Sequence, residues 1–190
     1  MRHDIASKSD GERVVARALD MTGRLDVLVN SAGVTSPARV LEIDEAEAER
    51  VLAINLKGAL FVTQAAVPAM RERGGSIVHI ASVAGQRGGG IFGGSHYAAS
   101  KAGVCGHAKA AARELAPLGI RVNAICPSYI ETDITAGMSD EQRAGVIASV
   151  PMGRGGTPDD VAGAALFLAS DLSAYVTGAE IDVNGGSHIH

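Results

Sequence analysis

The chain has 190 residues, of which 46% are hydrophobic and 20% charged, with a formal net charge of −4. This fits one domain over residues 1–190, and it argues against nucleic acid as a partner, because binding the phosphate backbone needs an excess of basic side chains. The composition also excludes a disordered chain and, with two cysteines, a disulfide framework. No apolar run reaches the roughly 18 residues of a membrane span and no secretory signal is visible, so we expect no membrane partner and a cytoplasmic location.

Short β-rich apolar runs alternate with longer helical stretches, which predicts a parallel sheet with crossover helices. The first helix is expected from Ser9, with Glu12 as its capping-box partner, to a stop at Gly23. The apolar run 26–30 predicts a strand buried on both faces. A long helix with an inward apolar face is expected from about 44 to 70.

The second half of the chain continues this alternation. The expected elements are a strand over 76–82, a glycine-rich loop over 85–94, a helix over about 97–116, a strand over 121–126 closed by Pro127, a loop over about 128–137, a helix opened by Thr157 and reaching about 169, and a last strand over 180–183. Right-handed crossovers place the carboxyl ends of all strands at one edge of the sheet, where ligands of such folds bind.

Ser82, Tyr97 and Lys101 form the most informative cluster of side chains. Tyr97 and Lys101 are four residues apart at the start of a helix, so they share a face. A phenol with a pKa near ~10 exchanges protons poorly at neutral pH, but an ammonium about 4 Å away would lower that pKa by roughly one to three units. Tyr97 would then serve as a general acid or base, with Ser82 holding a substrate oxygen. Taken alone, the same spacing also fits an ordinary amphipathic pair.

The context of this pair favours the chemical interpretation. Six motifs occur in order: Asn-Ser-Ala-Gly at 30–33, Asn55 within Ala-Ile-Asn-Leu-Lys-Gly, Ala-Ser-Val-Ala-Gly at 81–85, Tyr97-Ala-Ala-Ser-Lys101, Arg-Val-Asn-Ala-Ile-Cys-Pro-Ser at 121–128 and Val-Asn-Gly-Gly at 183–186. With them the chain resembles the short-chain dehydrogenase/reductase family from its first residues to its last. The resemblance implies an α/β fold, a Rossmann-type parallel sheet with helices on both faces, and an NAD(P)-dependent oxidoreductase that interconverts a secondary alcohol and a ketone.

The resemblance also implies a role for each catalytic residue. Tyr97 would be the general acid in ketone reduction and the base in alcohol oxidation. Lys101 would lower the pKa of Tyr97 and contact the nicotinamide ribose, and Ser82 would polarise the substrate carbonyl. Asn55 would hold a water that links Lys101 to solvent.

The implied cofactor is NAD or NADP, and the sequence leaves the choice between them open. Asp4 and Ile5 match the pair near adenine, while Ile130 and Thr132 match the loop that contacts the nicotinamide. The full set of positions implied for the cofactor is Asp4, Ile5, Asn30, Ala32, Gly33, Tyr97, Lys101, Pro127, Ile130 and Thr132.

The chain departs from the family pattern at its N-terminus. Family members begin with a strand and the turn Thr-Gly-x-x-x-Gly-x-Gly, whereas residues 1–5 here match the end of the third strand, so about 60 residues have no counterpart and the domain is expected to be partial. The absent first strand would lie beside 27–29, so we expect that strand to become an apolar edge. A Gly-x-Gly-x-x-Gly match at 88–93 does not join a strand to a helix, and we expect it to line the substrate cleft rather than bind phosphate. Smaller departures are Ser31 in place of the usual asparagine and Ser128 in place of glycine.

Two functions therefore remain open: an NAD(P)-dependent oxidoreductase, or a noncatalytic remnant that acts only as an oligomerising or interaction module. Small residues recur every four positions along one helix face, which predicts close packing of another helix there. These residues are Ala98, Ala102, Gly106 and Ala110. The resemblance implies that the partner helix belongs to a second copy, so a homo-oligomer, a dimer or tetramer, is expected. The substrate is expected to be a small alcohol or ketone, with 3-oxoacyl thioesters, polyols or sugars, and cyclic ketones all possible. The cysteines, Cys105 and Cys126, are interpreted as small buried side chains, and no metal site is predicted.

Overall fold

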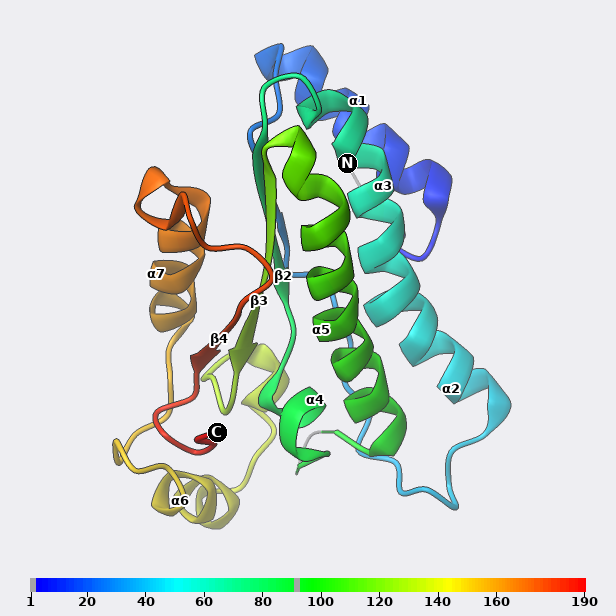
Figure 1. The fold of residues 1–190 in the computed structure, drawn as a ribbon. Coiled ribbons are helices and arrows are strands. Elements are labelled where there is room, and N and C mark those ends of the chain that lie inside the picture. The colour runs from blue at the N-terminus through cyan, green and yellow to red at the C-terminus, as the bar shows by residue number, and fades with distance from the viewer. Residues whose placement is uncertain (1–2, 91–92) are drawn as a thin grey trace.

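A computed structural model describes residues 3–90 and 93–190 of the chain, and its centre is a four-stranded parallel sheet (Figure 1). The strands β1 (Val27–Asn30), β2 (Gly75–Ile80), β3 (Ile120–Pro127) and β4 (Glu180–Val183) lie side by side in chain order. Each strand pairs with the next in parallel register. The expected α/β class with a parallel sheet is therefore confirmed.

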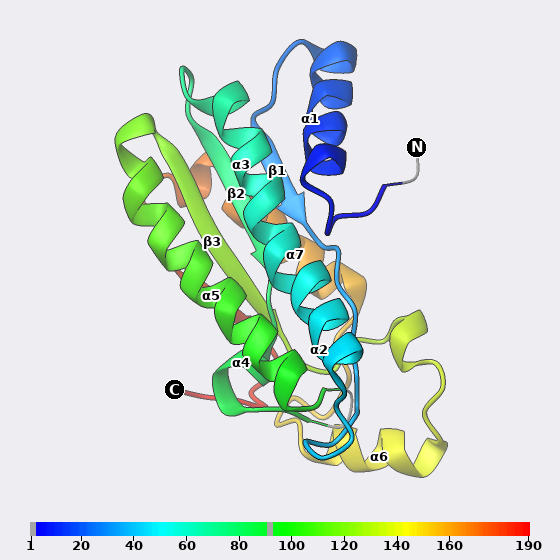
Figure 2. The ribbon, with the colours of Figure 1, turned by 90° about the vertical axis from the view of Figure 1, so that its right-hand side faces the viewer.

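Helices cover both faces of the sheet (Figures 1 and 2). The helices α1, α3 and α5 lie on one face and α7 lies on the other, while α4 and α6 lie beyond the carboxyl ends of the strands. The α-helices are α1 (Lys8–Thr22), α2 (Glu45–Leu52), α3 (Gly58–Met70), α4 (Val83–Arg87), α5 (Ser95–Leu115), α6 (Asp140–Ala148) and α7 (Pro158–Ala169). A π-helical turn, Ala53–Lys57, joins α2 to α3, and short 3₁₀ turns lie at Ala116–Leu118, Asp133–Thr135 and Asp171–Ser173.

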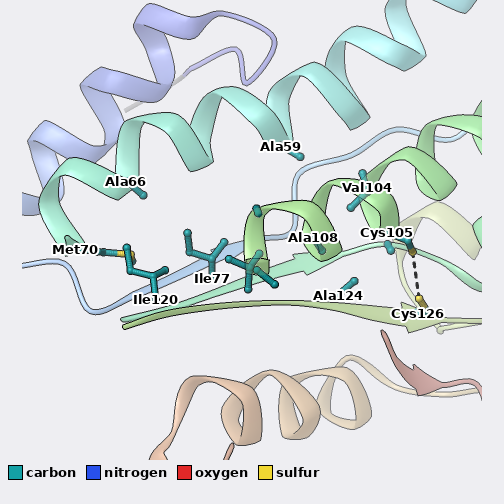
Figure 3. Close-up of a cluster of buried hydrophobic side chains, with 14 of the residues drawn as sticks. Ala59, Ala66, Met70, Ile77, Val104, Cys105, Ala108, Ile120, Ala124 and Cys126 are labelled. Carbon is teal, nitrogen blue, oxygen red and sulfur yellow. Dashed lines mark hydrogen bonds between the residues drawn. The ribbon is translucent and has the colours of Figure 1, made fainter. Parts of the chain in front are cut away.

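The two faces of the sheet follow from the alternation of side chains along its strands. Ile77 and Val122 point to the face of α3 and α5, where the larger apolar cluster lies (Figure 3). Val78 and Ile125 point to the opposite face and pack against Leu168 of α7. Because successive residues of a strand face opposite sides, these central strands are buried on both faces.

The connection from β3 to β4 differs from the two before it. The first two connections place α3 and α5 on one face, whereas the third runs through α6 and places α7 on the other (Figure 1). Since the strands follow each other in one direction, this third crossover has the opposite hand, and the expectation of right-handed crossovers throughout was wrong there. The long segment between Pro127 and α7 passes over the carboxyl ends of the strands. The chain can therefore reach the other face of the sheet before α7 begins, which makes a crossover of the opposite hand possible.

The strand β1 lies at an edge of the sheet. Among the described residues it pairs only with β2, and its Val29 side chain remains 45% exposed. Burial of this strand on both faces was therefore a wrong expectation, and the predicted apolar edge is confirmed. The reason is that no described strand covers its second side.

The start of α1 also differs from the expectation. Its N-cap is Ser7, whose hydroxyl accepts a hydrogen bond from the Asp10 N–H, so Ser9 lies inside the helix. The predicted stop is confirmed, because Gly23 adopts the left-handed conformation (φ 71°) that glycine tolerates at a helix end. The predicted cap of α7 is also confirmed, with Thr157 and Asp160 forming a capping box.

The continuous stretch Glu45–Met70 passes a length-and-hydropathy test for a membrane span. In this fold it is a core helix, because Val51, Ala59 and Met70 are fully buried and α3 packs on α1 and the sheet. Its π-helical turn was not predicted. The helix α4 was also missed, since the loop expected from residue 85 begins only after Arg87.

Candidate active site

The candidate active site is a cleft at the carboxyl ends of the strands, where the fold was expected to bind ligands. The cleft encloses about 890 Å³, a size typical of small-molecule sites. Four segments meet there: the loop after β1, the start of α4, the start of α5 and the segment after β3. From these segments the predicted site residues Gly33, Ser82, Tyr97, Lys101, Pro127, Ile130 and Thr132 all line the cleft.

Ser82, Tyr97 and Lys101 come together from two neighbouring elements. Ser82 follows β2 and is the N-cap of α4, where its hydroxyl accepts a hydrogen bond from the Ala84 N–H at 3.1 Å. Tyr97 and Lys101 lie on the first two turns of α5, on the face toward the cleft. The Lys101 ammonium donates to the Ile80 carbonyl oxygen at 2.7 Å and lies 6.0 Å from the centre of the Tyr97 ring.

Burial controls the protonation of this pair. It raises the pKa of Tyr97 above its usual 10, although the Ser82 hydroxyl acts in the opposite direction. It lowers the pKa of Lys101 to about 8, because a charged ammonium is costly in a buried place. The expected lowering of the Tyr97 pKa was therefore wrong for this structure. The reason is that the ammonium donates to the Ile80 carbonyl and lies 6.0 Å from the centre of the Tyr97 ring, so burial has the larger effect on the phenol.

Asn55 connects the loop after β1 to α5. Its side-chain oxygen accepts from the Val34 N–H at 2.8 Å, and its amide group donates to the Val34 carbonyl at 3.0 Å and to the Ser100 hydroxyl at 2.9 Å. Ser100 in turn donates to the Tyr97 carbonyl at 2.7 Å. Both amide hydrogens of Asn55 are therefore used by protein groups.

The residues matched to the cofactor divide into two groups. Gly33 lies directly against Asn55 and Lys101, because a Cβ atom there would lie 3.3 Å from both the Asn55 oxygen and the Lys101 nitrogen. Asn30 lies beside the cleft wall, where its side-chain oxygen accepts from the Ala32 N–H at 3.3 Å. Asp4 and Ile5 do not line the cleft.

Those two N-terminal residues have structural contacts instead. The Asp4 backbone N–H donates to the Asp10 carboxylate at 2.8 Å, which joins it to α1. The Ile5 side chain packs over Gly58, where an added Cβ would come within 2.9 Å. The structure therefore brings the residues matched to the nicotinamide side into one cleft, while the pair matched to the adenine side lies outside that cleft.

The glycine-rich stretch at 88–93 lies beside Tyr97. Gly89, Gly90 and Gly93 line the cleft, as expected for this loop, and Gly90 pairs with Gly93. A side chain at Gly93 would overlap the Tyr97 ring, so the close approach requires glycine. Ile91 and Phe92 of this motif lie outside the described residues.

A buried polar chain beside the site was only partly predicted. His79 was expected to be a hydrogen-bonded structural residue, which is confirmed: its ring nitrogens face Asn30 at 3.5 Å and Thr63 at 3.2 Å. The Thr63 hydroxyl also contacts His107 at 3.2 Å, a link that no local pattern indicated. Burial, with the neighbouring His107 and Lys101 charges, lowers the pKa of His79 to about 3, so this histidine is neutral.

His96 and Tyr129 are two further side chains near the site. His96 is buried outside the cleft lining, next to Gly94, which confirms its interpretation as loop packing. Tyr129 lines the cleft and was not predicted to do so. It is only 7% exposed, and its hydroxyl has no hydrogen-bond partner within the described part of the chain. Tyr129 lies two residues after Pro127, the last residue of β3. This position at the carboxyl end of a strand was the sequence signal that could have identified it as a cleft residue.

The cysteines are buried, as expected, but they are also neighbours. The Cys105 and Cys126 sulfurs lie 3.8 Å apart across α5 and β3. Their separation of 21 residues held no motif that indicated this contact.

Residues 1–188 match the family described as enoyl-(acyl carrier protein) reductase. A short-chain type dehydrogenase/reductase of Sinorhizobium fredii is 50% identical over the whole chain and extends further, since the chain covers 76% of it. A 3-oxoacyl-[acyl-carrier-protein] reductase of Thermotoga maritima is 44% identical over 96% of this chain and 74% of its own length.

Solved structures agree with these sequence matches. The crystal structure of a short-chain dehydrogenase/reductase of Brucella melitensis, described as a glucose/ribitol dehydrogenase, superposes with a TM-score of 0.93 at 35% identity, over all of this chain and 76% of the other. Both the sequence and the fold therefore match over essentially every residue described here, and the chain belongs to the short-chain dehydrogenase/reductase family of oxidoreductases.

Proposed function

We propose that this protein interconverts a secondary alcohol and a ketone with NAD or NADP, using Tyr97 as the general acid and base. The observation that carries the proposal is the meeting of Ser82, Tyr97 and Lys101 in one cleft at the carboxyl ends of the strands. A hydroxyl that can hold a substrate oxygen, a phenol and an ammonium are the groups that carbonyl reduction needs.

The protonation states favour proton donation by Tyr97. Its raised pKa keeps the phenol protonated at neutral pH, and Lys101 is charged below about pH 8. Tyr97 can then give its proton to a carbonyl oxygen held by Ser82. The phenolate that results is stabilised by the nearby ammonium, because an opposite charge favours the charged form.

The residues present fit the nicotinamide ribose end of a dinucleotide. The buried Lys101 ammonium has three N–H donors and, among residues 3–90 and 93–190, donates only to Ile80. Its remaining donors can bind ribose hydroxyls, and Gly33 leaves the space beside it open. When bound, the nicotinamide supplies or accepts the hydride. Ile130 and Thr132, which lie in the segment after β3 and line the cleft, would contact the nicotinamide ring.

The proposed substrate class is a 3-oxoacyl thioester. The Thermotoga maritima relative is named for reducing such a group on acyl carrier protein. The cleft also extends along an apolar wall that includes Val146, Val161 and Ala165, which suits an acyl chain.

The test is a titration of the full chain with NADH and with NADPH, followed by nicotinamide fluorescence, and then an assay with acetoacetyl-CoA as the 3-oxoacyl thioester. We expect cofactor binding and turnover in the parent. Tyr97→Phe should retain cofactor binding and lose about 10²- to 10⁴-fold in kcat, because it lacks the proton donor. No binding at millimolar cofactor, or a Tyr97→Phe variant within tenfold of the parent, would contradict the proposal.

A noncatalytic oligomerising module is the second candidate function. The observation that favours it is the exposed row of Ala102, Gly106 and Ala110 on α5, which offers a second copy a surface without bulky side chains. We propose a homo-oligomer in either case. Size-exclusion chromatography with light scattering measures the oligomeric state. A stable dimer or tetramer that binds neither NADH nor NADPH would favour this second function over the enzyme.

A further inference from the structure

A cluster of side chains of the types that bind metals lies behind the cleft wall, one helical turn from Lys101. Cys105 of α5, Cys126 of β3 and Glu180 of β4 meet on the sheet face that α5 covers. The two sulfurs are 3.8 Å apart and face each other in Figure 3, and the Cys126 sulfur is 3.9 Å from the Glu180 carboxylate. All three ligand atoms lie within 4.8 Å of one another.

These distances match a tetrahedral metal site better than a disulfide. A disulfide bond is about 2.05 Å long, so the sulfurs are too far apart to be bonded. Zinc–sulfur bonds of about 2.3 Å at tetrahedral angles place two sulfurs about 3.8 Å apart, and a carboxylate oxygen about 3.5 Å from each sulfur. The observed Sγ–Sγ distance of 3.8 Å equals the first value, and the sulfur–oxygen distance of 3.9 Å exceeds the second only slightly.

The surroundings orient the carboxylate and balance its charge. The Lys109 ammonium binds one Glu180 oxygen at 2.5 Å, and the Gln86 amide donates to the other at 2.9 Å. Two thiolates and one carboxylate carry three negative charges, which a divalent cation and the Lys109 ammonium would neutralise. The oxygen that Gln86 holds is the one nearer Cys126, so a cation would take the place of that amide hydrogen bond.

An approach from solvent exists along β4. Asp182 lies two residues after Glu180 on the same side of the strand, and the Gln86 amide also bonds it at 3.0 Å. His190 contacts Asp182 at 3.2 Å, and its side chain is 63% exposed. A cation therefore meets a row of polar groups between the surface and the buried thiols.

We propose that Cys105, Cys126 and Glu180 bind one thiophilic divalent cation of the zinc type, with a water at the fourth corner. Binding deprotonates both thiols, so protons are released as the metal enters. The site does not depend on the proposed enzymatic function. It is nevertheless adjacent to it, because Cys105 lies one helical turn after Lys101 and Cys126 directly precedes Pro127 of the cleft.

The test uses the full chain, reduced and freed of metal with a chelator, and titrated with Cd²⁺ and Zn²⁺. We expect one ion per chain by native mass spectrometry, a thiolate-to-cadmium absorption band and release of protons. Because the chain has only two cysteines, any such band reports these two residues.

Ligand variants identify the site. Cys105→Ala and Cys126→Ala should each weaken binding by at least about 100-fold, and Glu180→Gln should weaken it by about 10-fold or more. Glu72→Gln, an exposed acid after α3, is the control and should bind as the parent does. Circular dichroism checks that each variant is folded, and zinc should raise the Tm of the parent but not of Cys126→Ala.

Three outcomes would overturn the proposal. The first is a folded, reduced parent that shows no thiolate band with stoichiometric cadmium. The second is binding that survives in the double variant Cys105→Ala/Cys126→Ala, which would place the ion on surface histidines or carboxylates. The third is a chain that binds no metal and instead loses two hydrogens in mass on mild oxidation, which would identify a disulfide pair.

Discussion

Two walls of the same cleft differ in how firmly the fold holds them. The first, which we call the packed wall, is the contact of α4 and α5 with β2 and β3, and it carries Ser82, Tyr97 and Lys101. The second, the open edge, is β1 with the segment 31–34. On the packed wall, Lys101 is 6% exposed and most residues of the adjoining strands β2 and β3 are buried, whereas Val29 on the open edge is 45% exposed.

The difference shows which part of the chemistry each wall supports. Proton transfer depends on side chains whose positions are set by dense packing, so the packed wall can hold its groups without a ligand. The proposed cofactor site also includes the open edge, where Ser31, Ala32 and Gly33 are exposed. Asn55 joins the two walls, since it binds both Val34 and Ser100. Substitutions on each wall and at Asn55 test this contrast.

The largest expected effect is on the packed wall, at Gly85. An added Cβ there would lie 2.6 Å from the Ala102 backbone nitrogen and 2.7 Å from the Lys101 carbonyl carbon. Because backbone atoms cannot move aside easily, Gly85→Ala should lower the free energy of unfolding by about 3 kcal/mol in urea denaturation. Gly106→Ala is the matched control on α5: nothing lies within 4 Å of its Cβ position, so it should stabilise by about 0.5–1 kcal/mol. Equal effects of the two changes would contradict the contrast.

The link between the walls is tested by Asn55→Ala. This change leaves the Val34 N–H, the Val34 carbonyl and the Ser100 hydroxyl without their side-chain partner at a position that is 1% exposed. We expect a loss of about 2 kcal/mol in unfolding free energy, with faster amide exchange at Val34. Gln64→Ala on the exposed side of α3 is the control and should change stability by less than about 0.5 kcal/mol. Unchanged exchange at Val34 would show that Asn55 does not hold the open edge.

The third prediction concerns pH and His79. In the folded chain its pKa is lowered to about 3, while the unfolded chain takes up a proton below about 6.5. The unfolded state therefore binds more protons between these values, so stability is fully present above about pH 6.5 and falls as the pH is lowered. Between pH 6.5 and about pH 5 we expect a loss of about 1.5 kcal/mol.

Denaturation at a series of pH values measures this loss. His79→Gln should flatten the dependence above about pH 5, whatever its effect on overall stability, because glutamine does not titrate. Gln64→Ala, at an exposed position that does not titrate, should leave the slope unchanged. An unchanged slope in His79→Gln would mean that His79 is accessible to protons in the folded chain.

The smallest effect is expected on the open edge. Val29→Thr should change the free energy of unfolding by less than about 0.5 kcal/mol, because the side chain is already 45% exposed. The same substitution at Val78 of the central strand, which is 0% exposed, buries a hydroxyl and should cost about 2 kcal/mol. Thermal and urea unfolding compare the two variants. Similar losses at both positions would show that β1 is buried in solution, for instance against another chain.

Much of the fold was predictable because its signals are local. Short β-rich apolar runs identified each strand, and β4 begins and ends at the predicted residues Glu180 and Val183. The Thr157 cap and the Gly23 stop were also confirmed, since a cap depends on a few adjacent residues. The spacing of Tyr97 and Lys101 likewise placed both side chains on one helix face, where the structure has them. The motif order identified the family.

Tertiary structure alone decided the features that depend on distant residues. The contact of Cys105 with Cys126, the link of His79 to His107 and the partners of Asn55 all join segments far apart in the chain. The direction of the Tyr97 pKa shift also required the fold, because it depends on burial and on where the Lys101 ammonium finds an acceptor. The sequence by itself determines the periodicity of apolar residues, the residues that cap the helices and the chemical type of each side chain. Desolvation and through-space distance arise only once helices and strands are packed together.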